Sequence, residues 1–172
     1  MIELSTIRDL VAIFGVIAGF TYYVLTVQNT RKNQQQQLET RQAQLFMSIY
    51  QNWASKDNLK DLEKWIAMEW TDYDDFFTRY SPQTTPDEHA SWDKMIYYFE
   101  GLGLLVKQEL VNPISVSELL GAAIIFLWEK YSPLLIEMRE RVQMPDQWSN
   151  FEYLYNKMNK LRPERPEHIK PR

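Results

Sequence analysis

One uncharged run near the N-terminus constrains this chain more than any other feature. Residues Leu10 to Val27, LVAIFGVIAGFTYYVLTV, contain no charged residue, no proline, no Asn and no Gln. At about 1.5 Å per helical residue the run is about 27 Å long, close to the ~30 Å hydrocarbon core of a bilayer. Backbone amides inside lipid must be satisfied within the segment, so the run is predicted to form a transmembrane helix.

The run differs from a cleaved secretion signal. Such signals have a basic N-terminal region and a short apolar stretch of about 7–15 residues. Here residues 1–9 contain Glu3, Arg8 and Asp9, the apolar stretch is longer, and no A-x-A site follows it. We therefore expect a retained membrane anchor.

Positive charge beside the run sets its predicted orientation. Only Arg8 precedes the run, whereas Arg31 and Lys32 follow it closely. Because Lys and Arg are kept on the cytoplasmic side, we expect a single-pass cell-membrane protein with its N-terminus outside and its C-terminal domain in the cytoplasm. Tyr22, Tyr23, Arg31 and Lys32 are expected at the membrane interface, where amphipathic rings and basic side chains are favoured.

Composition limits what the rest of the chain can be. The 172 residues are 45% hydrophobic and 14% aromatic, enough for a single folded core after the anchor and too apolar for a disordered chain. The absence of cysteine excludes disulfides and thiolate metal sites and fits a reducing cytoplasm. The expected organisation is a short N-terminal segment 1–9, a transmembrane helix 10–27, a polar juxtamembrane helical stalk 28–44, a helical cytoplasmic domain 45–161 and a Pro-rich tail 162–172.

Charge is spread unevenly along the chain. Residues 28–55 carry +2, from three basic residues and one acidic one, and residues 56–112 carry −6, from six basic and twelve acidic ones. Basic residues beside the anchor suit an anionic inner leaflet, so membrane lipids are an expected partner. Nucleic acid is not an expected partner, because its binding requires a basic face.

The segment after the run, QNTRKNQQQQLETRQAQ, contains neither Gly nor Pro. Its Gln, Arg, Lys and Glu residues favour helix, and apolar residues return with helical spacing at Leu45, Ile49 and Trp53. We predict one continuous helix from about Thr6 to Ala54, whose Leu45, Ile49 and Trp53 stripe packs against the domain. A flexible Gln-rich linker is the alternative.

The remaining pattern is helical throughout, since no stretch alternates with period two. Thr85 to Glu88 combines an N-cap Thr, a Pro at the first position and a Glu at the third, and Asn112-Pro113 is expected to end that helix. Ser115 and Glu118 form a second capping box, and Pro133 is expected to kink or restart the helix that follows. The expected helices are 57–70, 86–111, 115–142 and 147–161, with a short turn of helix within 71–80.

The fold class is therefore all-α, with one N-terminal transmembrane helix continuing as a polar helical stalk into a four- to five-helix soluble domain. The run LLGAAIIFLW from Leu119 to Trp128 is apolar all round, but its ten residues are too few for a second span and indicate a buried core helix. The six tryptophans fall mostly on apolar stripes and are expected in the core. The helix 57–70 should bury Leu59, Leu62, Trp65, Ile66 and Trp70.

Gly15 and Gly19 form a G-x-x-x-G motif inside the run. Two glycines on one face of a helix allow a second helix to approach closely, so they predict a helix–helix contact in the membrane. The expected partner is a second copy of this chain or another membrane protein. Gly101 and Gly103 are likewise expected to let another helix pack closely.

Polar residues that could carry chemistry have simpler interpretations. Asp72, Asp74 and Asp75 lack the glycine and glutamate of a calcium loop and indicate a solvated acidic turn. Glu100, inside an apolar stretch, is expected to be buried and paired with a Lys or Arg; a carboxyl with a raised pKa is the alternative. His89 is expected to be exposed. We therefore predict no catalytic, cofactor or metal residue, and no enzyme.

Two segments carry a resemblance to a known family. They are TVQNTRKNQQQQLETRQAQLFMSIYQNW, and YYFEGLGLLVKQELVNPISVSELLGAAIIFLWEKYSPLLIEMRER followed by WSNFEYL. Their order resembles a family of prokaryotic single-span membrane proteins catalogued only as a domain of unknown function. The resemblance implies an N-terminal anchor and a cytoplasmic helical domain, and supplies no activity, cofactor or catalytic residue.

These features favour a non-enzymatic interaction protein, either a scaffold or a small accessory subunit of a membrane complex. A membrane-anchored sensor that transmits a change along the continuous helix is the alternative. An enzyme that relies on carboxylates such as Glu100 is the least favoured hypothesis.

Overall fold

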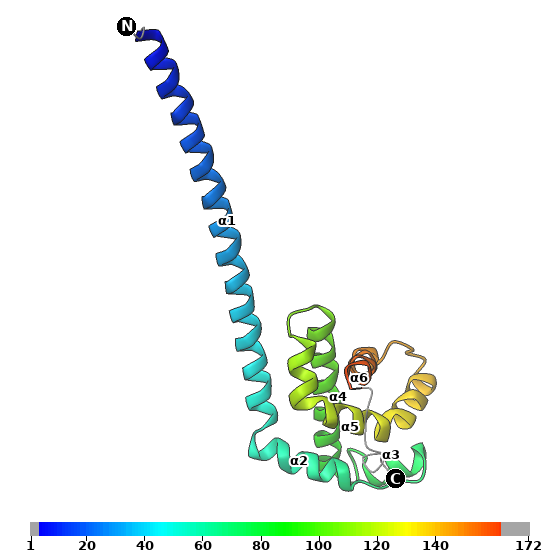
Figure 1. Cartoon of the computed structure of the whole chain (residues 1–172). Coiled ribbons are helices and arrows are strands. Elements are labelled where there is room, and N and C mark those ends of the chain that lie inside the picture. Colours follow the sequence, from blue (N-terminus) through cyan, green and yellow to red (C-terminus); the bar gives the residue numbers. More distant parts are fainter. Residues whose placement is uncertain (1–3, 163–172) are drawn as a thin grey trace. The chain divides into compact units, whose positions relative to one another are not determined.

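The computed structural model describes residues 4–162, and within that range every regular element is a helix (Figure 1). This confirms the all-α fold class. The chain divides into two compact units, Met1–Arg41 and Gln42–Arg172. The helices are α1 (Leu4–Trp53), α2 (Lys56–Ala67), α3 (Tyr73–Arg79), α4 (Pro86–Lys107), α5 (Pro113–Val142) and α6 (Ser149–Leu161).

The first unit consists of α1 up to Arg41. The helix runs without interruption through the Gln-rich segment, as predicted from the lack of Gly and Pro. The Thr21, Thr30 and Thr40 hydroxyls each donate to the carbonyl oxygen four residues earlier, at 2.8–2.9 Å, so these hydroxyls are satisfied within the helix. Gln35 also donates to Glu39 one turn on, at 3.0 Å. Local interactions therefore support the helix.

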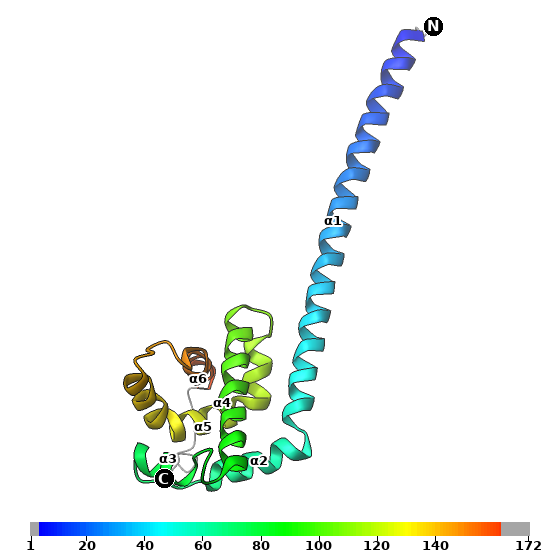
Figure 2. The ribbon, with the colours of Figure 1, turned by 180° about the vertical axis from the view of Figure 1, so that it is seen from behind.

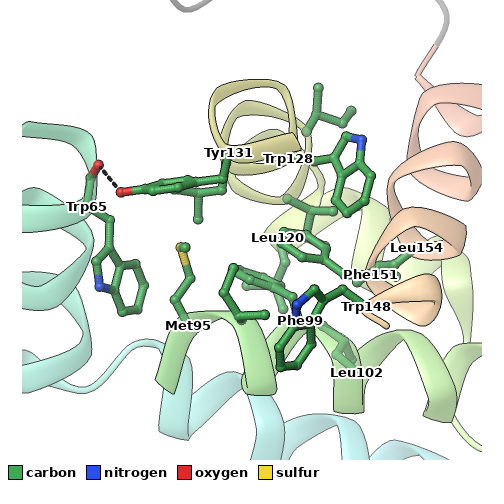
Figure 3. Close-up of a cluster of buried hydrophobic side chains, with 14 of the residues drawn as sticks. Trp65, Met95, Phe99, Leu102, Leu120, Trp128, Tyr131, Trp148, Phe151 and Leu154 are labelled. Atoms are coloured by element: carbon green, nitrogen blue, oxygen red, sulfur yellow. Dashed lines mark hydrogen bonds between the residues drawn. The ribbon is translucent and has the colours of Figure 1, made fainter. Parts of the chain in front are cut away.

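The second unit is built around aromatic side chains. α6 lies against both α4 and α5 (Figures 1 and 2). Phe99 of α4 and Phe151 of α6 stack at its centre, with ring centroids 4.9 Å apart and Leu120 of α5 beside them (Figure 3). Five of the six tryptophans are buried and Trp70 is half-buried, which confirms that tryptophan belongs to the core.

The last turns of α1 belong to this core. Trp53 is buried, and Leu45 and Ile49 are partly buried and pack against the core. The Tyr98 hydroxyl of α4 donates to the Ile49 carbonyl oxygen at 3.0 Å. The predicted Leu45, Ile49 and Trp53 stripe is therefore confirmed, whereas Leu38, seven residues before Leu45, is 55% exposed.

The helix predicted over residues 57–70, which corresponds to α2, extended too far, and its predicted buried face was partly wrong. The helix ends at Ala67, and Leu59 and Ile66 are exposed. Trp65 is buried as predicted, and Asn58, which was not predicted, is buried as well. The Asn58 side chain can be buried because its amide donates to the Asn52 side-chain oxygen at 3.1 Å.

The α4–α5 boundary also differs from the prediction. α4 stops at Lys107, four residues early, because Glu109 adopts a left-handed conformation (φ 58°). Asn112 then begins α5 rather than only ending α4, since its side chain accepts from the Ile114 amide at 2.8 Å and Pro113 follows at the first helical position. The expected capping box at Ser115 therefore lies inside a helix that has already started.

α5 continues through Pro133 to Val142 without a break. Its course changes direction along its length, so it wraps the core rather than restarting (Figure 1). α6 then buries Phe151, Leu154 and Met158, which are spaced by three and four residues and so lie on one face of the helix. Most of the predicted Pro-rich tail, residues 163–172, and His168 within it lie outside the described residues.

Candidate functional site

Exposed apolar surface is the main candidate for function in this structure. Among the described residues, two helices are long and apolar enough to cross a membrane, one within α1 and the other α5. None of the most apolar window of α1 is buried, and half of that of α5 is. Large apolar surface in contact with water is unfavourable, so the uncovered apolar window of α1 is the feature of this structure that most needs an explanation.

The predicted anchor residues all lie on the part of α1 that belongs to the first unit. A Cβ atom added to Gly15 or Gly19 would meet nothing within 4 Å, so the face that carries the motif is open. Tyr22 and Tyr23 follow within two turns and are exposed. Arg31 and Lys32 are exposed about two turns further along the same helix. Along α1 the order is therefore the glycines, then the aromatic pair, then the basic pair.

α5 carries the apolar surface that the sequence did not predict. Its run from Leu119 to Trp128 was expected to be buried, and on the inner side it is, with Leu120, Ile124 and Leu127 inaccessible to solvent. Its outer side is not covered, since Leu119 is 52% exposed and Ala122 is exposed. The apolar composition all round the helix was the signal that could have indicated a second contact surface.

Glu100 joins α4 to the start of α6. Its carboxylate accepts hydrogen bonds from the Asn150 side-chain amide at 2.7 Å, the Asn150 backbone at 3.3 Å and the Phe151 backbone at 2.8 Å. The expected Lys or Arg partner was therefore wrong. The first amides of a helix have no partner within the helix and lie at its positive end, so a carboxylate stabilises them. Glu100 therefore stabilises the packing of α6 on α4.

Gly103 and Gly101 have different surroundings, although the sequence predicted that both would let another helix pack closely. A Cβ on Gly103 would lie 2.0 Å from the Asn150 carbonyl oxygen, so the predicted close approach is confirmed there. A Cβ on Gly101 would meet nothing within 4 Å, so no described helix packs on Gly101.

The acidic turn is used to hold α3. Asp72 caps the helix by accepting from the Asp75 amide at 2.9 Å, and Asp75 bonds to Arg79 at 2.7 Å. Asp74 bonds to Arg141 of α5 at 2.6 Å, and this hydrogen bond lowers the pKa of Asp74. Within residues 4–162 there is no group of His, Cys, Asp and Glu side chains that could hold a metal ion.

His89 is only 17% exposed at its side chain, which corrects the expectation of an exposed residue. Its Nδ1 lies 2.7 Å from the Tyr80 carbonyl oxygen, and its Nε2 lies 3.6 Å from Asp93. The contact with Tyr80 joins α4 to the end of α3, so this histidine also serves the fold.

Buried polar links between α2, α4 and α5 were missed by the sequence reasoning. The Trp65 indole donates to the Ser91 hydroxyl at 2.9 Å, and the Tyr131 hydroxyl donates to the Trp65 carbonyl oxygen at 2.8 Å (Figure 3). Burial raises the pKa of Tyr131. Sequence offers no signal for such pairs, because their members are 26 and 66 residues apart.

Comparison with known families agrees with the resemblance seen in the sequence. The model of a domain of unknown function, DUF4760, matches residues 10–158, so the chain belongs to that family. No curated protein and no solved structure matches the chain.

Proposed function

We propose that this member of the DUF4760 family is a membrane-anchored interaction protein without enzymatic activity, acting as a scaffold or as a small accessory subunit of a membrane complex. The observation that carries the proposal is the uncharged segment 10–27 of α1, of which none of the most apolar window is buried. Lipid is the environment in which such a surface is stable. The proposed location is the cell membrane, single-pass, with the N-terminus outside and the second unit in the cytoplasm.

Three of the polar side chains considered for chemistry are engaged in the fold. Glu100 binds the start of α6, Asp74 binds Arg141, and His89 lies against Tyr80. This supports a binding role over an enzymatic one. The proposed partners are membrane lipids and either a second copy or another membrane protein, and not nucleic acid.

Fractionation tests the anchor and its orientation. The full chain should stay in the membrane pellet after alkaline carbonate extraction, because a spanning helix is not released by high pH. Protease added to sealed spheroplasts should leave the second unit intact. Release into the supernatant would contradict the anchor, and digestion in sealed cells would reverse the proposed orientation.

A membrane-anchored sensor is the second candidate. The observation that favours it is the uninterrupted α1, which leads from the apolar segment to the core residue Trp53. Purification in mild detergent distinguishes the two functions. An accessory subunit should co-purify with another protein at fixed stoichiometry, whereas a sensor should purify alone or as a homo-oligomer and change state with a ligand.

A further inference from the structure

Basic residues are concentrated at the C-terminal end of the chain. Residues 153–172 contain six basic residues and two acidic ones, so they carry a net charge of +4. Residues 56–112, in contrast, carry −6. The one acidic residue of α6, Glu152, is already bound to Arg139 at 2.6 Å. The second half of α6 therefore opens a cationic part of the chain that the helix itself does not neutralise.

Three lysines share one side of the second unit around α6. Lys157 and Lys160 are three residues apart, so they lie on one face of the helix. Tyr153, four residues before Lys157, lies on the same face, and the Lys107 Nζ of α4 is 5.9 Å from the centre of its ring. Lys107 and Lys160 are exposed and Lys157 is partly exposed. We refer to Lys107, Lys157 and Lys160 as the α6 basic surface.

The α6 basic surface has no carboxylate bound to it. Within residues 4–162 none of its three lysines forms an ion pair, although Glu109 follows Lys107 by only two residues. Five other cations of the second unit each lie within 2.6–3.6 Å of a carboxylate, namely Lys64, Arg79, Lys94, Arg139 and Arg141. The charge of the α6 basic surface is therefore available to an anion from outside the described chain.

We infer that the α6 basic surface binds the anionic lipid headgroups of the membrane in which α1 is anchored. An anionic leaflet attracts clustered Lys and Arg side chains. Leu161, four residues after Lys157, is 40% exposed and adds an apolar side chain beside the lysines. Basic residues next to an exposed apolar one are the combination that helices lying on a membrane surface present.

The acidic segment of a second copy fits the α6 basic surface less well. Three carboxylates of residues 56–112 already bind basic side chains of their own chain, namely Asp61, Asp74 and Asp75. A contact between two different surfaces also does not close on two copies and leads to open chains of molecules. A leaflet carries negative charge over its whole area and has neither restriction.

The inference rests on the proposed function, because it requires the anchor. Gln42, the first residue of the second unit, follows Val27 by fifteen residues, which span about 22 Å as a helix. The second unit therefore begins close to the end of the proposed span. This tether raises the effective concentration of the leaflet for the α6 basic surface, so a few basic side chains are sufficient.

A quencher carried by the lipid tests the contact on the full-length chain in vesicles. The natural chain contains no cysteine, so Asn156→Cys gives one thiol for a bimane label, at an exposed position one turn before Lys160. Headgroup-linked nitroxide should quench this label about twofold more in vesicles of equal phosphatidylcholine and phosphatidylglycerol than in phosphatidylcholine alone. Salt at about 1 M, where the screening length is about 3 Å, should remove the difference.

Ala90→Cys is the control position, because Ala90 is an exposed alanine of α4 outside the α6 basic surface. Its label should be quenched equally in both kinds of vesicle. Equal quenching of the label at position 156 in both lipids would overturn the inference, and so would the same lipid dependence at both positions.

Paired substitutions separate the α6 basic surface from net charge. Lys157→Gln with Lys160→Gln, in the Asn156→Cys chain, should abolish the lipid dependence without changing the melting temperature. Lys56→Gln with Lys60→Gln removes the same charge from exposed lysines of α2 and should leave the lipid dependence intact. Equal effects of the two pairs would overturn the inference, because any lysine would then serve.

Two controls identify the cause of a negative result. Bimane emission at position 156 that changes with the ratio of protein to phosphatidylcholine, without any effect of phosphatidylglycerol, would assign the α6 basic surface to a second copy and overturn the inference. Flotation with vesicles of phosphatidylcholine, which has no net charge, tests the anchor alone. A chain that does not float contradicts the proposed function, whereas one that floats without lipid-dependent quenching contradicts only the α6 contact.

Discussion

At the scale of single residues, two glycines of α4 have opposite surroundings. A Cβ on Gly103 would lie 2.0 Å from the Asn150 carbonyl oxygen, and a Cβ on Gly101 would meet nothing within 4 Å. Gly103→Ala should therefore lower the free energy of unfolding by about 1–3 kcal/mol, because α6 must move away. Gly101→Ala is the matched control and should raise it by about 0.5–1 kcal/mol. Chemical denaturation measures both, and equal effects would contradict the close α4–α6 approach.

Glu100 is the residue that holds the start of α6. Glu100→Gln keeps the shape of the side chain but removes the charge and turns one acceptor into a donor that faces backbone amides. The free energy of unfolding should fall by about 1–3 kcal/mol. Glu63→Gln, at an exposed position of α2, is the control and should have little effect. A Glu100→Gln chain as stable as the control would show that the three hydrogen bonds contribute nothing.

At the scale of elements, the last turns of α1 are held by one stripe. Leu45→Asp should destabilise the second unit by about 2–4 kcal/mol, because it places a carboxylate without a partner against the core. Leu38→Asp is the control, since Leu38 is exposed. Thermal melting followed by circular dichroism measures both variants. If Leu45→Asp melts like the natural chain, the end of α1 is not held by the core.

α3 is joined to α5 by an ion pair that should respond to pH. The hydrogen bond from Arg141 lowers the pKa of Asp74 in the folded chain below its ordinary value of 3.8. The pair therefore stabilises the fold fully above that value, and the contribution is lost as the pH falls through the lower folded pKa. The melting temperatures of the natural chain and of Asp74→Asn should differ at pH 7 and converge in acid. A difference that does not shrink as the pH is lowered would contradict the assignment.

At the scale of the whole molecule, the proposed helix–helix contact in the membrane can be tested at the two glycines of the apolar segment. Gly15→Ile with Gly19→Ile should keep the segment apolar and inserted while it prevents close approach of a second helix. The expected result is loss of a co-purifying membrane partner or of a homo-oligomer in mild detergent. Retention of both would show that the glycine spacing has no role in the membrane, and assembly would then depend on the second unit.

The sequence by itself determined the parts of this protein that depend on neighbouring residues. α1 continues past the apolar run because the Gln-rich segment that follows contains neither Gly nor Pro. The Leu45, Ile49 and Trp53 stripe follows from helical spacing. Both are local, because helix propensity and periodicity act over three or four residues. The family match over residues 10–158 agrees with the same order of segments.

Only the tertiary structure decided which distant groups meet. Glu100 accepts hydrogen bonds from amides about fifty residues away, and Gly103 packs closely against the Asn150 carbonyl. Glu109 ends α4 in a left-handed conformation that no sequence motif predicts. The exposure of Leu119 and Ala122 on a mostly buried run is of the same kind. Each depends on how whole helices pack, and composition cannot specify that packing, because an apolar residue fits a core or an interface equally well.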